Sequence, residues 1–193
     1  MTPREVQEYT ALRATIRERG TARVWVFLAL LVAWAAATIA TAALAQLPVA
    51  TLLPLFMLAA GFEAIYHLHT GVERIGRYLQ VFYSGDDPSH PERDWERTVM
   101  AYGRAFPGSG SDPLFTIYFI LATILNFVPV LLAEPVRLEV TVIGLVHLGF
   151  VARVFVARHS SNGQRARDLE RFAQIKSGGS GGSGTRPTWQ ERP

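Results

Sequence analysis

The feature that most constrains this chain is a set of long apolar runs with few charged residues. No charged residue occurs over 24–47 or over 49–62, and the second run continues past Glu63 to about His69. A helix needs roughly 20 mostly apolar residues to cross the hydrocarbon core of a bilayer. Both runs are long enough, so the sequence predicts two membrane-spanning helices joined by a tight turn at 46–48.

A second pair of apolar runs repeats this plan. Residues 114–133 are uncharged and follow Asp112 and Pro113, an N-cap side chain and a proline that are typical of a helix start. A turn at 134–137 leads to a fourth run, 140–157, which only His147 and Arg153 interrupt. The second pair therefore also predicts an antiparallel hairpin.

Together these runs predict an all-α, polytopic membrane protein. We expect four transmembrane helices in two antiparallel hairpins, with amphipathic helices in the cytoplasm or at the membrane interface. The expected segments are a cytoplasmic amphipathic helix (1–23), the first transmembrane hairpin (24–70), a cytoplasmic loop with interfacial helices (71–112), the second transmembrane hairpin (113–158) and a cytoplasmic tail with a Gly/Ser linker (159–193).

The basic residues predict the orientation of these spans. Eighteen of the 19 lysines and arginines lie in the leader, in the loop between the hairpins and from Arg153 onward, whereas the two short turns contain only Arg137. Cytoplasmic loops carry an excess of basic residues, so both termini should be cytoplasmic. Signal-peptide cleavage after 43–45 is a competing interpretation, but the leader is long and contains three acidic residues.

Several stretches outside the spans have helical patterns. Residues 3–19 predict an amphipathic helix that lies on the membrane surface or packs beneath the bundle. The second span should continue into the cytoplasm. A further helix should begin at Ser89, with Trp95, Val99, Tyr102 and Phe106 on one face. Residues 164–176 predict a short charged helix, and 177–184 a flexible Gly/Ser linker.

The composition excludes several kinds of chemistry and suggests in which membrane the protein is located. The chain has no cysteine, which excludes disulfides, thiolate metal sites and cysteine nucleophiles. The predominance of arginine and alanine suggests a bacterium with a GC-rich genome, hence the inner membrane. Nucleic acid is not an expected partner, because the loop 70–113 has seven acidic residues against five arginines.

Polar residues within the predicted spans are the candidate functional residues. Such side chains are costly in a bilayer and usually face the bundle interior, where they pair with one another. Depths estimated from the helical rise suggest one network. Its members are Glu63, His67, Asn126, His147 and Arg153.

Three interpretations of this cluster remain open. His67 and His147 could ligate haem, but their depths differ by about 10 Å at the helical rise. Glu63 could titrate in proton or solute transport with His147 as a relay. In the third, Glu63 and Arg153 form an interhelical ion pair, and Asn126 and His147 fix packing. We expect no metal site, because His67 and His69 point in different directions on a helix.

The sequence contains no catalytic motif, and we predict a non-catalytic membrane protein. The preferred function is a small subunit or scaffold that packs against other membrane proteins or against itself. The alternative is a proton-coupled transporter or channel-like protein, and an enzyme of lipid or quinone chemistry ranks third. A small-residue stripe in the first span supports helix packing. Its members are Ala29, Ala33, Ala36, Ala40 and Ala43.

Overall fold

The computed structural model describes residues 2–43, 47–83, 98, 101–102, 105–106, 112–133 and 135–180, except the side chains of residues 162, 179 and 180. Within these ranges the regular secondary structure is all helical, without strands, so the predicted all-α fold class is confirmed. The elements are α1 (Pro3–Ala42), the 3-10 helix η1 (Pro48–Thr51), α2 (Leu52–Tyr83), α4 (Thr116–Leu132) and α5 (Arg137–Ser180).

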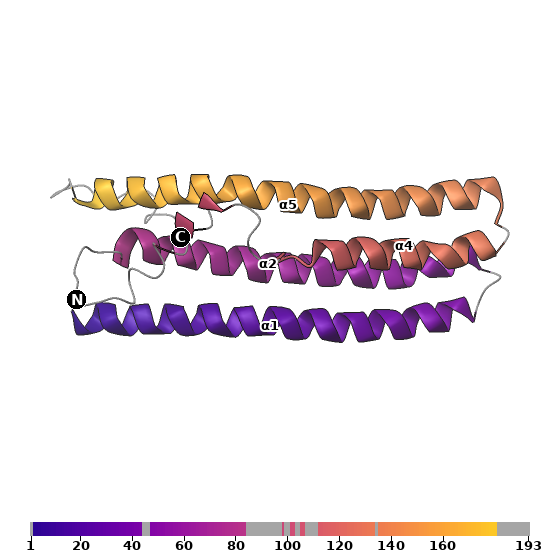
Figure 1. Ribbon diagram of the computed structural model, residues 1–193, viewed down its shortest axis with the longest axis horizontal. Helices are drawn as coiled ribbons and strands as arrows, with labels where there is room; N and C mark the ends of the chain where they lie inside the picture. Colours follow the sequence, from indigo (N-terminus) through magenta and orange to yellow (C-terminus); the bar gives the residue numbers. More distant parts are fainter. Residues whose placement is uncertain are drawn as a thin grey trace, which may run out of the picture.

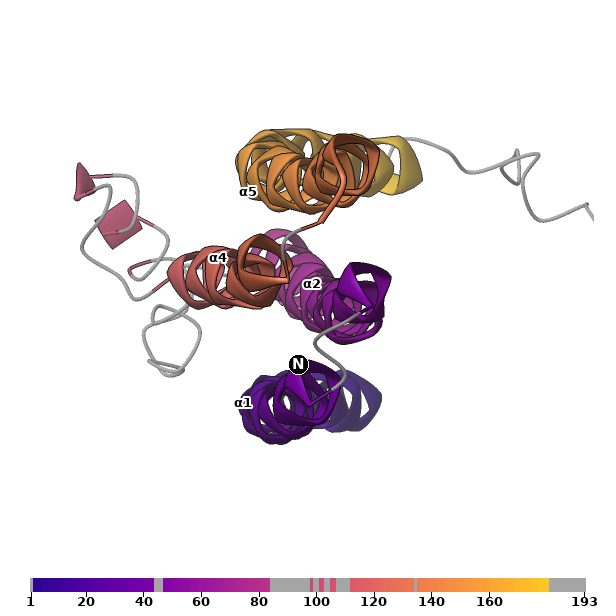
Figure 2. The same ribbon diagram turned by 90° about the vertical axis from the view of Figure 1, so that its right-hand side faces the viewer.

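The four long helices run side by side along one axis (Figure 1). Viewed end-on, α2 lies between α1 and α5, and α4 lies beside α2 (Figure 2). The helix α4 covers only the part of the bundle near the end of α1 and the start of α5 (Figure 1). Among the described helices, the molecule therefore has a four-helix half and a three-helix half built from α1, α2 and α5.

In the described part of the chain, three helical segments are long and apolar enough to cross a membrane: Pro3–Ala42, Pro48–Tyr83 and Arg137–Gly178. The helix α4 is apolar but has only 17 residues. At 1.5 Å per residue, α1 with its 40 residues and α5 with its 44 measure about 60 and 66 Å. Since a hydrocarbon core is about 30 Å thick, these helices must also extend well outside a membrane.

The predicted leader helix and first span form one continuous helix, α1. Its start is fixed by a capping box, in which Thr2 Oγ1 accepts from the Glu5 N–H and Glu5 Oε2 accepts from the Thr2 N–H. No proline or new cap follows before the apolar run, and the single Gly20 is tolerated within a helix. The polarity of the sequence changes near Arg23, whereas the backbone conformation does not.

The expectation of a separate helix over 164–176, followed by a linker from 177, is wrong where the structure describes it. The helix α5 continues without a break from the apolar run to Ser180. No proline separates the two parts, and residues 164–176 are mostly good helix formers. Residues 181–184 lie outside the described ranges, as do Ser89, Trp95 and Val99 of the predicted loop helix.

The start of α4 differs from the prediction by a short turn. The helix begins at Thr116, and Asp112 caps it from four residues away, with Oδ2 accepting from the Thr116 N–H at 2.6 Å. Phe115 adopts a left-handed conformation with a φ of 52°. Its ring stacks on Phe27 of α1 with the centroids 4.1 Å apart, a contact that can offset the backbone strain.

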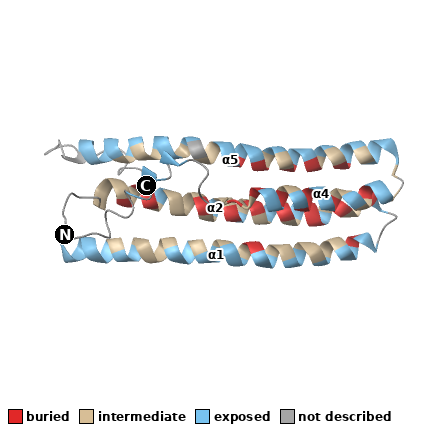
Figure 3. Cartoon of the chain, in the orientation of Figure 1, coloured by how far each residue is buried: buried red, intermediate tan, exposed pale blue. Residues whose placement is uncertain are grey.

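The apolar core lies in the four-helix half, mainly along α2, α4 and α5 (Figure 3). Phe27 is the only residue of α1 among the buried members of its main cluster. Gly61 of α2 lies against Leu30 of α1, and a Cβ at this position would force the Leu30 side chain to move. Buried residues recur along one stripe of α2: Leu55, Leu58, Phe62, Ile65 and His69.

Candidate functional site

Four of the five predicted polar residues within the spans form two separate pairs. In the first, Arg153 of α5 donates from Nη2 to Glu63 Oε2 of α2 over 2.8 Å. Both side chains are 39% exposed, and the Arg153 guanidinium also lies 5.1 Å from the centre of the Tyr66 ring. Tyr66 in turn hydrogen-bonds Ser160 at 3.1 Å. This pair joins α2 to α5 near the middle of the molecule.

The second pair is formed by Asn126 of α4 and His147 of α5, and both are buried. The Asn126 Nδ2 group donates to the Thr51 carbonyl at 2.9 Å and contacts His147 Nε2 at 3.1 Å. His147 Nδ1 lies 2.8 Å from the Ile143 carbonyl. A carbonyl can only accept, so Nδ1 carries the proton and Nε2 accepts from Asn126. These bonds tie η1, α4 and α5 together.

A layer of aromatic rings lies between the two pairs. Phe150 is three residues from both His147 and Arg153 on α5, and its ring contacts Phe62 and Phe119. Phe62 and Phe119 also meet edge to face at 5.1 Å, and both are essentially inaccessible to solvent. The aromatic layer therefore interrupts any hydrogen-bonded path from the Asn126 pair to the Glu63 pair.

His67 does not join either pair. It is exposed on α2, and its described side-chain contact is with the neighbouring Tyr66 ring. Both ring nitrogens of His147 are already engaged with protein groups. This arrangement does not fit haem ligation by His67 and His147. Within the described residues, no group of three or more histidine, aspartate or glutamate side chains is arranged to hold a metal ion.

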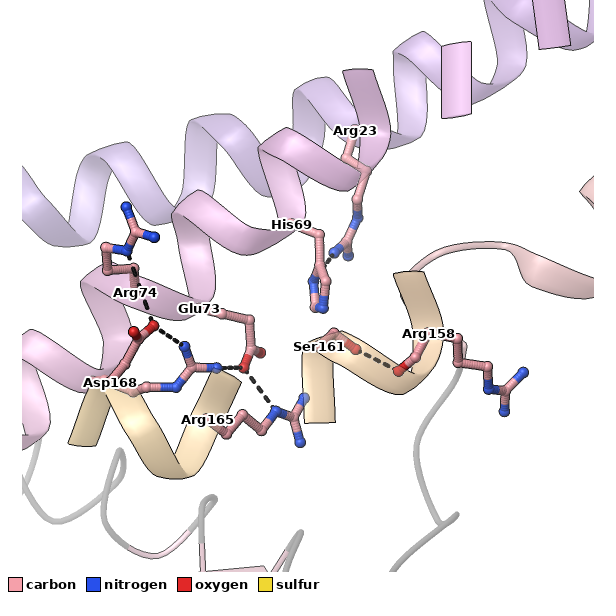
Figure 4. A network of polar contacts seen from close by, with 9 residues as sticks. Arg23, His69, Glu73, Arg74, Arg158, Ser161, Arg165 and Asp168 are labelled. Atoms are coloured by element: carbon pink, nitrogen blue, oxygen red, sulfur yellow. Dashed lines mark hydrogen bonds and ion pairs between the residues drawn. The ribbon is translucent and has the colours of Figure 1, made fainter. Parts of the chain in front are cut away.

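The sequence analysis missed an ionic network where α2 and α5 extend beyond the four-helix half (Figure 4). Arg77 is only 3% exposed and donates to Asp168 Oδ2 at 3.0 Å and to Glu73 Oε2 at 2.6 Å. Arg165 also donates to Glu73, at 3.0 Å. The spacing of Glu73 and Arg77 by four residues could have indicated a helical ion pair. Nothing in the sequence indicates the partners on α5.

An aromatic cluster closes the far end of this three-helix half. The rings of Tyr78 and Phe82 on α2 pack edge-on against Phe172 of α5. On the other side, Tyr78 donates to Glu8 of α1 at 2.8 Å. Burial, with the nearby Glu8 carboxylate, raises the pKa of Tyr78 well above its usual value. The leader part of α1 thus packs alongside α2 as a continuation of the first apolar run.

An apolar groove of about 510 Å³ lies between α4 and α5 in the four-helix half. Its walls include Ile124, Phe127, Leu145 and Leu148, and His147 lies at its base. The only polar side chains lining it besides His147 are Thr123 and Thr141. Their hydroxyls donate to backbone carbonyls of their own helices. The groove therefore offers apolar contact rather than reactive groups.

Comparison of the chain with protein-family models, curated proteins and solved structures finds no match. Its function must therefore be argued from the arrangement of its own residues.

Proposed function

We propose that this chain is a small, non-catalytic membrane subunit or scaffold that packs against other membrane proteins. In this proposal the apolar parts of α1, of η1–α2 and of α5, together with α4, form four spans in a bacterial inner membrane. The 17 residues of α4 are near the lower limit for a span. Both termini lie in the cytoplasm, since all basic residues except Arg137 would then be on the cytoplasmic side or near its interface.

The observation that carries the proposal is the outward face of α1. Only 6% of the residues in the 18-residue apolar stretch of α1 are buried. All five alanines of the small-residue stripe are exposed. The stripe lies opposite the face on which Phe27 stacks on Phe115 before α4 and Leu30 lies against Gly61 of α2. Small residues let a second helix approach closely in a membrane, where van der Waals packing rather than hydrophobicity drives association. The face therefore suits another transmembrane helix.

The polar interior supports a structural role. Glu63 is paired with Arg153, and His147 with Asn126, across different helices. Such bonds fix the register of helices in a bundle. The alternative, proton-coupled transport through Glu63 and His147, requires a polar path between them, and the Phe62–Phe119–Phe150 layer occupies that position.

Orientation can be tested with single cysteines, because the natural chain contains none. Thr21→Cys and Val136→Cys place exposed thiols at opposite ends of the spans. In intact cells, a membrane-impermeant maleimide should label position 136 after outer-membrane permeabilisation, and should label position 21 only in lysed cells. The reverse pattern, or labelling of both positions from one side, would overturn the proposed topology.

Packing against partners can be tested by photocrosslinking in the native membrane. A photoreactive amino acid at Ala36 should give one discrete adduct with another membrane protein. At Leu148, an exposed position on α5, the same group should give lipid adducts only. Lipid adducts alone at both positions would contradict the proposal. A discrete adduct at Leu148 with none at Ala36 would also contradict it.

A further inference from the structure

Arg23, at the boundary of the first apolar run, forms no ion pair with a carboxylate among the residues that the structure describes. Its Nη1 lies 3.2 Å from Nδ1 of the buried His69, which is a ring nitrogen and not a carboxylate (Figure 4). Its Nε is buried without a hydrogen-bond partner among the described residues. Burial lowers the pKa of Arg23, although Glu73 partly opposes this. Within the described part of the chain, burial therefore disfavours the charge of Arg23, and Glu73 compensates it only in part.

The surroundings of Arg23 have an excess of positive charge. Among the described residues, the network between α1, α2 and α5 contains four arginines (Arg23, Arg74, Arg77, Arg165) and two carboxylates (Glu73, Asp168). Both carboxylates already accept from other arginines. His69 accepts from Arg23 at Nδ1, so it is neutral there and carries its proton on Nε2. The cluster can therefore accept an anion without displacing an existing ion pair.

The location of Arg23 narrows the choice of anion. It directly precedes the charge-free run 24–47, so it lies at the level of lipid headgroups in the proposed topology. Arg19 is one turn away on α1, and its Nη1 would lie 2.5 Å from a Cβ on Gly71. The missing side chain at Gly71 leaves room for this second guanidinium beside α2. Trp25, which is 68% exposed, is of the type enriched at membrane interfaces.

We propose that Arg23, with Arg19 beside it, binds the phosphate of an anionic lipid headgroup in the cytoplasmic leaflet. A guanidinium presents planar N–H donors that match phosphate oxygens, and basic clusters between helices on this side of a membrane suit such headgroups. The lipid phosphate would supply an ion-pair partner for Arg23, which the described side chains around it do not provide. The inference rests on the proposed orientation of the spans.

The test compares lipid binding by the purified wild-type protein, R23Q, R23K and R137Q in a non-ionic detergent. Arg137 is a matched control, because it is an exposed arginine at the opposite end of the spans. Native mass spectrometry would measure binding of phosphatidylglycerol and, separately, of zwitterionic phosphatidylcholine. We expect R23Q to weaken phosphatidylglycerol binding about fivefold or more, R137Q to match the wild type, and R23K to be intermediate.

Equal weakening in R23Q and R137Q, or none in R23Q, would overturn the proposal. If R23Q fails to fold, the wild-type protein alone still tests the proposal. Equal affinity of the wild type for the two lipids would contradict a site that binds anionic headgroups. Displacement of the lipid by millimolar inorganic phosphate would show that the site takes a soluble anion instead. Lipid binding in detergent does not depend on orientation, so this result and the cysteine-labelling result can fail separately.

Discussion

The two halves of the molecule are held together in different ways although the same three helices run through both. In the four-helix half, the centre is apolar and aromatic, with one neutral hydrogen-bonded pair at Asn126 and His147. In the three-helix half, a buried arginine, Arg77, occupies the centre and bridges α2 to α5 through Asp168. Leu79 is the only buried large apolar side chain on α2 beyond His69.

This difference follows from the solvent that each half is proposed to meet. In lipid, helices gain little from burying apolar surface, so packing and a few hydrogen bonds must specify the bundle. In water, long polar helices can pair through charges, but burying those charges is favourable only when every partner is present. Mutations in the ionic centre of the three-helix half should therefore lower stability more than mutations in the polar pairs of the four-helix half.

The largest effect is expected from Arg77→Ala. The substitution leaves Asp168 and Glu73 without their buried partner, which should cost about 3–5 kcal/mol. Hydrogen exchange should accelerate in α5 from about residue 162 to residue 178 and stay unchanged over 140–157. Arg74→Ala is the control, because Arg74 is 67% exposed and 3.9 Å from Asp168. Protection lost equally in both parts of α5 would contradict the separation of the halves.

Asn126→Ala should have the next largest effect, about 1–3 kcal/mol. It removes the donor to the Thr51 carbonyl and leaves His147 Nε2 unpaired in an apolar setting. Thermal unfolding in detergent measures the change. Leu125→Ala, at an exposed neighbouring position, should change the midpoint little. If the two variants are equally stable, the hydrogen bonds of Asn126 do not stabilise the four-helix half.

Tyr78→Phe should cost about 1 kcal/mol, since it removes the hydrogen bond to Glu8 between α1 and α2. It should also change the response to pH. The folded-state pKa of Tyr78 is raised, so its stabilising effect is present below about pH 10, the ordinary tyrosine pKa, and is lost as the pH rises further. Unfolding measured from pH 8 to 11 should therefore show a steeper loss in the wild type than in the variant. Parallel curves would contradict this.

The smallest effect is expected from Glu63→Gln. Glutamine keeps an oxygen that can accept from Arg153, so the change in stability should be below about 1 kcal/mol, the size of most interhelical hydrogen bonds in membranes. Proton flux into liposomes containing the variant should equal that of the wild type. A wild-type flux that the substitution abolishes would favour transport over a structural role.

The sequence predicted which segments are helical better than it predicted which face of each helix is buried. Apolar runs identified the segments in α1, α2, α4 and α5, and the continuation of α2 to Tyr83 was expected. The helix ends were less predictable, because polarity changes at a membrane boundary while helix propensity does not. Glu63 and His67 share a flank, but the buried stripe through Phe62 and His69 lies about a third of a turn or more away. That stripe explains why His67 is exposed.

The ionic centre could not be predicted because its partners are far apart in the sequence. Asp168 meets Arg77 across 91 residues, and the two belong to helices whose relative rotation no local pattern specifies. The burial of Arg77 was also not predictable, because an arginine on an amphipathic helix is usually exposed. Only the folded arrangement shows that its charge is satisfied from both α2 and α5.

The most direct test of the central claim is purification from the native membrane in mild detergent, for the wild type and for Ala36→Leu. The wild type should carry other membrane proteins in fixed proportion. The variant should fold normally but lose them, since a larger side chain prevents close approach at the α1 stripe. A wild-type protein that emerges alone, or a variant that keeps the same partners, would contradict the claim that this face binds another membrane protein.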